Sequence, residues 1–170
     1  MRIVKFLLLM LVLAAGVIFV VGYRLPEAHE ASVERDYAYP AARVYQAIAT
    51  PAQYPRWRKG VQRVDLLPDS AGLKRFREYA LGDEVTYVVE EAVPAQVYVT
   101  RIADKGLPYG GAWTYELAPS GTGTRLTITE NGEVYNPIYR FISKYVLGHT
   151  RSLERYHTDL EKRRAMPVTD

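Results

Sequence analysis

Two ionisable residues in the second half of the sequence are candidates for acid–base chemistry. His149 falls in a stretch where apolar residues recur every three or four positions, and burial there would lower the pKa of its imidazole. Glu130 continues an alternation of apolar residues, so its carboxylate is expected to face inward and could pair with His149 or a tyrosine. Each also has a structural interpretation, His149 as a hydrogen-bonded core residue and Glu130 as a residue turned outward by a bulge near Asn131. We therefore assign no catalytic role to either.

Other catalytic and metal-binding arrangements lack support in the sequence. The chain has no cysteine, which removes thiolate nucleophiles, disulfides and Cys-based metal sites. His149 and His157 would lie about 12 Å apart along a helix, too far to share a metal ion, and His29 falls in a predicted linker. Glu90 and Glu91 are adjacent in a predicted strand and cannot both face inward, which argues against a glycosidase-type carboxylate pair. We expect neither a metal nor a cofactor.

Short strands dominate the middle of the sequence. Residues 31–38 alternate, with Val33 and Tyr37 on one face, as a strand would. Pro40 then opens a short helix, and a second short helix or turn carries Trp57. Six further strands are expected, linked by short turns that favour an antiparallel sheet: 61–67, 73–80, 84–91, 96–102, 111–118 and 124–130.

The last part of the chain has the periodicity of a helix. From Pro137 to Leu160, apolar and aromatic residues recur at three- and four-residue spacing, while Arg140 and Lys144 occupy the opposite face. We expect one long amphipathic helix that covers the sheet with its apolar stripe. The fold class is therefore α+β, with a curved antiparallel sheet around a C-terminal helix.

Local motifs within this order of elements resemble the START-like, or SRPBCC, superfamily, which includes polyketide cyclase/dehydrase-like proteins. The run YPAARVY at 39–45 followed by YPRW at 54–57 is similar to the opening of that superfamily. The runs GGAWTYEL at 110–117 and GTRLTI at 123–128 look like its last two strands. The resemblance implies a helix-grip fold, and members bind lipids, sterols, polyketides or plant metabolites, some as cyclases and others as carriers.

A hollow between the sheet and the C-terminal helix would be the binding site in such a fold. Apolar and aromatic side chains with a few polar groups are typical of ligand cavities, although the same side chains could fill a solid core. Strand alternation and the helical stripe predict the following lining residues: Tyr87, Trp113, Tyr115, Ile128, Glu130, Tyr145, His149 and Tyr156.

The N-terminal segment is long and apolar enough to cross a membrane. Residues 6–22 carry no charge, and about 20 residues at roughly 1.5 Å each span a hydrocarbon core of about 30 Å. A cleaved signal peptide is the alternative, with only a poor cleavage site at residues 20–22. We expect an anchor at 1–24 that contacts the membrane through residues 3–23, a linker at 25–30, a START-like domain at 31–164 and a tail at 165–170. Arg2 and Lys5 before the span favour an N-in, single-pass topology with the domain on the extracytoplasmic, periplasmic side.

Charge gives no indication of nucleic-acid binding. The net charge of +3 comes entirely from Arg2, Lys5 and Arg24, because the remaining 19 basic residues equal the 19 acidic residues. The leading hypothesis is a membrane-tethered binding or carrier domain for a hydrophobic small molecule or lipid. A cyclase or hydrolase that uses the same cavity, and an envelope interaction domain that binds no ligand, remain as alternatives.

Overall fold

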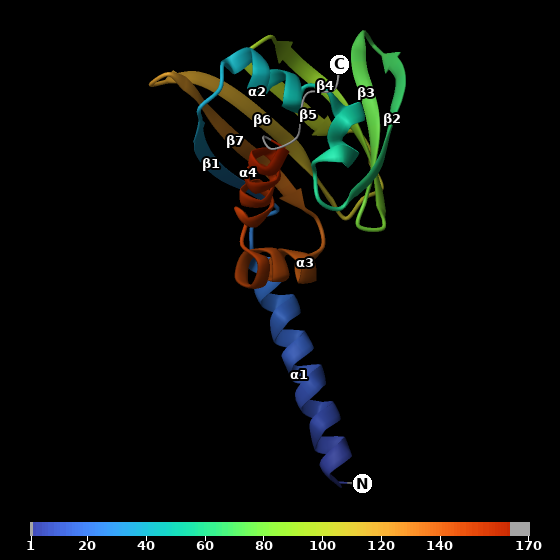
Figure 1. The fold of residues 1–170 in the computed structure, drawn as a ribbon. Coiled ribbons are helices and arrows are strands. Elements are labelled where there is room, and N and C mark those ends of the chain that lie inside the picture. Colours follow the sequence, from blue (N-terminus) through green and yellow to red (C-terminus); the bar gives the residue numbers. More distant parts are fainter. Residues whose placement is uncertain (1, 164–170) are drawn as a thin grey trace.

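A curved antiparallel sheet forms the body of the protein, and one helix projects away from it (Figure 1). The computed structural model describes residues 2–163. Its helical segments are α1 (Arg2–Arg24), α2 (Ala41–Ile48), the 3₁₀ turn η1 (Pro51–Arg56), α3 (Pro137–Ile142), the π-turn η2 (Ser143–Leu147) and α4 (Arg151–Arg163). Its strands are β1 (Ala28–Tyr37), β2 (Val61–Ser70), β3 (Leu73–Ala80), β4 (Asp83–Val93), β5 (Val97–Ile102), β6 (Tyr109–Ser120) and β7 (Gly123–Val134).

The seven strands form one sheet in the order β1-β7-β6-β5-β4-β3-β2. Strands from β2 to β7 are consecutive neighbours, and β1 pairs with the last strand, with Val33 opposite Ile128. Register shifts in the β4–β5 pair between Val89 and Glu91 and in the β2–β3 pair add local bends, as β-bulges do. The expected α+β class, with an antiparallel sheet and a C-terminal helix, is confirmed.

The helix α4 lies against the concave side of the sheet, and α2 and η1 close one end (Figure 1). The buried residues of α4 include Leu153, Tyr156 and Leu160, which join Leu126 and Ile128 of β7 in one core cluster. His157 of α4 is also fully buried. Its Nε2 donates to the Val33 carbonyl (3.2 Å) and its Nδ1 accepts from the Tyr37 hydroxyl (2.8 Å), which fastens α4 to β1.

The C-terminal helix is interrupted, which corrects the expectation of one continuous helix from Pro137. Gly148 has φ of 75° and ψ of 145°, a conformation outside the helical region that glycine adopts without steric cost. Its amide donates to the carbonyl of Ser143, so the chain makes a π-turn before it leaves the helix. The apolar periodicity continues in the sequence on both sides of Gly148, but the two sides belong to α3–η2 and to α4.

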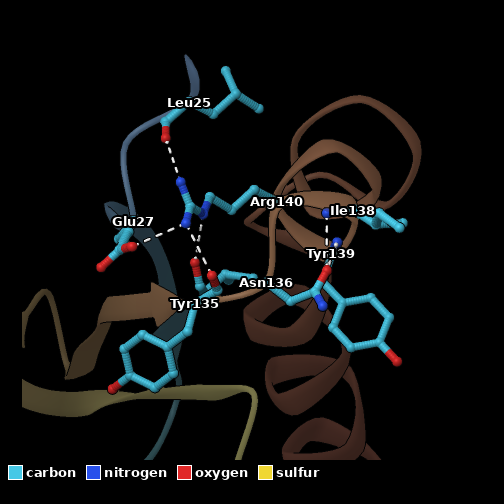
Figure 2. A network of polar contacts seen from close by, with 8 residues as sticks. Leu25, Glu27, Tyr135, Asn136, Ile138, Tyr139 and Arg140 are labelled. Atoms are coloured by element: carbon cyan, nitrogen blue, oxygen red, sulfur yellow. Dashed lines mark hydrogen bonds and ion pairs between the residues drawn. The ribbon is translucent and has the colours of Figure 1, made fainter. Parts of the chain in front are cut away.

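A buried arginine holds the end of α1 close to α3. The Arg140 guanidinium of α3 donates to the carbonyls of Leu25, Val134 and Tyr135 and to the carboxylate of Glu27, with all four distances 2.9 Å (Figure 2). The Asn136 side chain caps α3 by accepting from the amides of Ile138 and Tyr139. The strand expected from residue 31 begins at Ala28, so only Leu25–Glu27 separate α1 from the sheet.

The helix α1 is a candidate membrane span. An 18-residue window within Arg2–Arg24 has a mean hydropathy of 2.9, and none of that window is buried against the rest of the protein. Gly22, at its inner end, lies directly against the carbonyl of Pro137, where no side chain would fit. The body therefore contacts only the last turns of α1, and the rest of the helix projects freely (Figure 1). The predicted tail at 165–170 and the expected domain boundary at residue 164 lie outside the described residues.

Candidate functional site: a hollow between sheet and helix

A hollow of about 200 Å³ lies between the sheet, η1 and α4. Most of its lining is aromatic or aliphatic, and among the described residues its only charged members are Arg58 and Glu78. The lining residues are Tyr54, Arg58, Phe76, Glu78, Tyr87, Thr100, Trp113, Tyr115, Ile128, Ser152, Leu153 and Tyr156. A volume of this size suits a compact ligand, since pockets for drug-sized molecules usually measure about 300–1,000 Å³.

An ion pair forms the charged part of this lining. The Arg58 guanidinium donates to the Glu78 carboxylate at 2.5 Å, and the Glu78 side chain is almost completely buried. Burial opposes the charge on Arg58, but Glu78 and the tyrosines around it outweigh that effect and raise its pKa. The guanidinium also lies over the rings of Tyr54 (4.8 Å) and Tyr156 (5.1 Å), a cation–π arrangement. Arg58 is therefore a fixed positive charge at the wall of the hollow.

The Tyr156 hydroxyl, on α4, is buried and has no hydrogen-bond partner of normal geometry among the described residues. Burial, together with the neighbouring Tyr54 and Tyr115, raises the pKa of Tyr156 well above its ordinary value. Burial likewise raises the pKa of Tyr115 to about 12, so both hydroxyls stay protonated at neutral pH. Tyr54 differs from Tyr156 because its hydroxyl is satisfied by the carbonyl of Ile48. An unsatisfied buried hydroxyl is costly, and a ligand atom can supply the missing partner.

Aromatic rings make up the apolar side of the hollow. Phe76 of β3 stacks on Tyr87 of β4 with ring centroids 5.1 Å apart, and Tyr87 meets Trp113 of β6 at a steep angle with centroids 6.1 Å apart. Ile128 of β7 and Leu153 of α4 complete this side. Inward positions of β3, β4 and β6 thus supply the rings, and β7 supplies Ile128.

Glu130 lies beside the hollow and connects it to the start of β1. Its Oε2 accepts from the indole of Trp113 (3.1 Å) and from the hydroxyl of Ser152 (3.0 Å), both of which line the hollow. Its Oε1 accepts from Nε2 of His29 (3.3 Å), and the His29 ring stacks on that of His149 with centroids 3.9 Å apart. Burial, and secondly the proximity of His29, lower the pKa of His149.

The structure gathers some of the predicted lining residues and separates others. Tyr87, Trp113, Tyr115, Ile128 and Tyr156 line the hollow, and Glu130 is hydrogen-bonded to its edge. Two of the predicted residues are placed elsewhere. Tyr145 is 57% exposed in η2, and His149 lies in the break after Gly148 on the far side of Glu130. The assumption of one unbroken helix put both in register with Tyr156, and the break at Gly148 removes that register.

Sequence reasoning missed the ion pair. Glu78 lies two residues from Phe76 in β3, so an acidic residue on the apolar phase of a strand was the signal available for it. Arg58 follows η1 in an irregular turn and carried no such signal. Within residues 2–163, no group of three His, Cys, Asp or Glu side chains is arranged to hold a metal ion.

Comparison with known proteins identifies the family. The family model for polyketide cyclase/dehydrase and lipid transport matches residues 28–161, which is most of the chain. The chain belongs to this polyketide cyclase/dehydrase and lipid transport family. The START-like resemblance of the sequence is thereby confirmed. A search of curated protein sequences finds no match.

Several solved structures share the fold of this chain. A Thermus thermophilus protein is 22% identical with a TM-score of 0.64, and the alignment covers 79% of this chain and 96% of that one. A START superfamily protein from Mycobacterium smegmatis is 17% identical with a TM-score of 0.60, at 79% and 96% coverage. The di-domain aromatase/cyclase StfQ of the steffimycin pathway is 12% identical with a TM-score of 0.64 over 82% of this chain. The chain spans about half, 52%, of StfQ, and at these identities the likeness concerns the fold.

Proposed function

We propose that the protein is a membrane-anchored binding domain for a compact, mainly apolar molecule that carries one polar group. The observation that carries this proposal is the buried Tyr156 hydroxyl, which has no hydrogen-bond partner of normal geometry among residues 2–163 and lines the hollow beside Arg58. A ligand with an oxygen atom near Tyr156 and a ring or short chain against Phe76, Tyr87 and Trp113 would satisfy both sides of the site. A whole phospholipid would be too large for a volume of about 200 Å³.

Catalysis has less support than binding. The hydroxyls of Tyr115 and Tyr156 are held in the protonated form by burial, and the Glu78 carboxylate is already paired with Arg58. The Glu130 carboxylate accepts hydrogen bonds from Trp113, Ser152 and His29, while His149 does not line the hollow. None of these groups is placed as a free general base for a molecule in the hollow.

The anchoring part of the proposal rests on α1. Its 23 residues measure about 35 Å at about 1.5 Å per residue, enough to cross a hydrocarbon core of about 30 Å. The contact of Gly22 with Pro137 and the bond of Arg140 to Leu25 favour a helix that is retained as part of the folded protein. Arg2 and Lys5 at the free end favour an N-in orientation, with the body on the extracytoplasmic side.

A pair of substitutions on β5 tests the binding proposal. Thr100 is buried and lines the hollow, while Val99, the residue before it, points to the opposite face of the sheet. The full-length protein would be purified from its native host in detergent, and native mass spectrometry would detect a co-purifying small molecule. We expect the wild type and Val99→Phe to retain it and Thr100→Phe to lose it. A wild-type protein that carries nothing, and takes up no apolar fluorescent probe, would refute the proposal.

The topology needs a separate measurement. Because the chain has no cysteine, Leu81→Cys in the exposed β3–β4 turn gives a single reactive site on the body. We expect a membrane-impermeant maleimide to label it in cells whose inner membrane is intact. Labelling only after lysis would reverse the proposed orientation.

A further inference from the structure

The segment from Tyr135 to Leu147 exposes a group of large apolar side chains that the core does not use. Within the described part of the body, residues 28–163, nine large apolar side chains are exposed, and six of them fall in this 13-residue stretch. Their exposed fractions range from 42% to 65%. We call this group the interfacial patch: Tyr135, Ile138, Tyr139, Tyr145, Val146 and Leu147. The other three, Leu66, Leu73 and Leu81, are spread over β2, β3 and the turn that follows β3.

The local structure explains why these side chains face outward. No residue of η2 is buried, whereas five residues of α4 are. The π-turn and the break at Gly148 separate η2 from α4, so η2 does not follow α4 onto the sheet. Only Arg140 of α3 is buried, and its guanidinium donates hydrogen bonds to Leu25 and Glu27, which directly follow α1. Large exposed apolar areas are rare on soluble monomeric proteins unless something binds to them, so this concentration of apolar side chains on one short segment needs an explanation.

The position of the patch indicates what covers it. The close contact of Gly22 with Pro137 places the start of α3 beside the last turn of α1, on the side of the body from which α1 projects (Figure 1). Arg140 fixes this arrangement through Leu25 and Glu27 (Figure 2). Since the last turn of a spanning helix lies at the membrane surface, α3 and η2 lie at that surface too.

The composition of the segment matches the polar–apolar boundary of a bilayer. Three of the six patch residues are tyrosines, which are enriched at membrane–water interfaces, and the others are aliphatic. Residues 135–153 contain no aspartate or glutamate but include two exposed basic residues, Lys144 and Arg151. The Lys144 ammonium lies 5.7 Å from the centroid of the Tyr145 ring, and Arg24 ends α1 nearby. Basic and aromatic residues on one short segment favour an anionic lipid surface.

We propose that α3 and η2 form an interfacial segment that lies in the headgroup region of the membrane that α1 crosses. The interfacial patch contacts the outer part of the acyl chains, and Lys144 contacts anionic headgroups. This inference rests on the proposed anchoring by α1, but it concerns a second, independent contact with the bilayer. As a consequence, the first turn of α4, which contributes Ser152 to the hollow, lies just above the lipid surface.

Single-cysteine probes in the full-length protein can test both contacts separately. Val146→Cys reports on the patch, Leu81→Cys on another exposed aliphatic residue, in the β3–β4 turn, and Leu13→Cys on the middle of α1. Each variant is labelled with an environment-sensitive fluorophore and reconstituted into vesicles of phosphatidylcholine and phosphatidylglycerol. Quenching is measured with a spin-labelled phospholipid and with aqueous iodide.

We expect the lipid quencher to reach residues 13 and 146, and iodide to reach only residue 81. Quenching by lipid at residue 13 but by iodide at residue 146 would overturn the interfacial segment while the anchor stands. Lipid quenching at neither position would overturn the anchor and with it the segment. Protection of residue 146 from both quenchers would also overturn the proposal, since it would mean that another protein surface covers the patch. Adding Lys144→Glu to Val146→Cys should at least halve the lipid quenching, and no change would overturn the role of Lys144.

Discussion

The Glu78 carboxylate accepts a hydrogen bond from the Arg58 guanidinium inside the hollow, although the two residues come from β3 and from the turn after η1. The pair leaves a charged group at the wall of an otherwise aromatic site. Removing one member of a buried pair is destabilising because the other charge remains unpaired.

Glu78→Gln should therefore lower the free energy of unfolding by about 3 kcal/mol, in the range for a broken buried pair. Denaturant unfolding in detergent can be followed by the fluorescence of Trp57 and Trp113, which both lie in the body. The matched control is Glu90→Gln, which removes an exposed partner of Arg101 and should cost less than about 1 kcal/mol. Equal losses for the two variants would show that the Arg58–Glu78 pair is not effectively buried.

Tyr156→Phe should separate the stability of the empty protein from its affinity for ligand. The substitution removes a hydroxyl that has no hydrogen-bond partner of normal geometry within residues 2–163, so stability should stay the same or rise by up to about 1 kcal/mol. Affinity for the co-purifying molecule, titrated through Trp113 fluorescence, should fall about tenfold, which corresponds to about 1.4 kcal/mol. Tyr98→Phe, at a buried tyrosine outside the hollow lining, should leave affinity unchanged. The opposite result, lower stability with normal affinity, would assign Tyr156 a structural role only.

Mild acid should destabilise the body through His157. Burial, and to a smaller extent Arg35, lower the pKa of His157, against the opposing effects of the Val33 carbonyl and Glu161. The unfolded chain, with a histidine pKa of about 6.5, then binds more protons than the folded chain. The free energy of unfolding should consequently fall as the pH decreases through about 6.5, and His149 contributes in the same direction.

Unfolding midpoints measured at several pH values between about 8 and 5.5 would check this dependence. His157→Gln should be less stable than the wild type at pH 8 but show a flatter profile. A wild-type midpoint that stays constant or rises toward pH 5.5 would contradict the expected direction.

Two glycines of α1 make a matched pair for the contact with α3. A side chain at Gly22 would collide with the backbone of Pro137, while a side chain at Gly16 would meet nothing within 4 Å. Gly22→Leu should therefore separate α1 from α3, and Gly16→Leu should not. Spin labels at residues 13 and 81 would show a broadened distance distribution only for Gly22→Leu. Identical distributions for the two variants would mean that the last turn of α1 does not pack on α3.

The sheet and most of the aromatic lining could be predicted from local patterns. A strand repeats every two residues, so Tyr87, Trp113, Tyr115 and Ile128 could be assigned to the inner face without knowledge of their partners. Gly, Pro and Asp mark the turns in the sequence, so the strand boundaries from Val61 onward could be predicted to within a few residues.

The C-terminal region shows where such patterns are insufficient. Periodicity indicates which residues share an apolar face but not whether the helix is continuous, so the spacing did not indicate that Gly148 leaves the helical conformation. The contact of His29 with Glu130 and His149 depends on pairing between the first and last strands, a long-range feature without a local signal. The Arg58–Glu78 pair likewise required the position of η1 relative to β3.

Three residues between α1 and β1 determine how far the binding site can travel. Extended fully, Leu25–Glu27 could span only about 10 Å, and the Arg140 bonds to Leu25 and Glu27 keep the segment from extending. If α1 crosses a bilayer as proposed, this short connection confines the body to the surface of that bilayer. A molecule taken up in the hollow must return to the same leaflet, dissolve, or pass to a partner that comes to the protein.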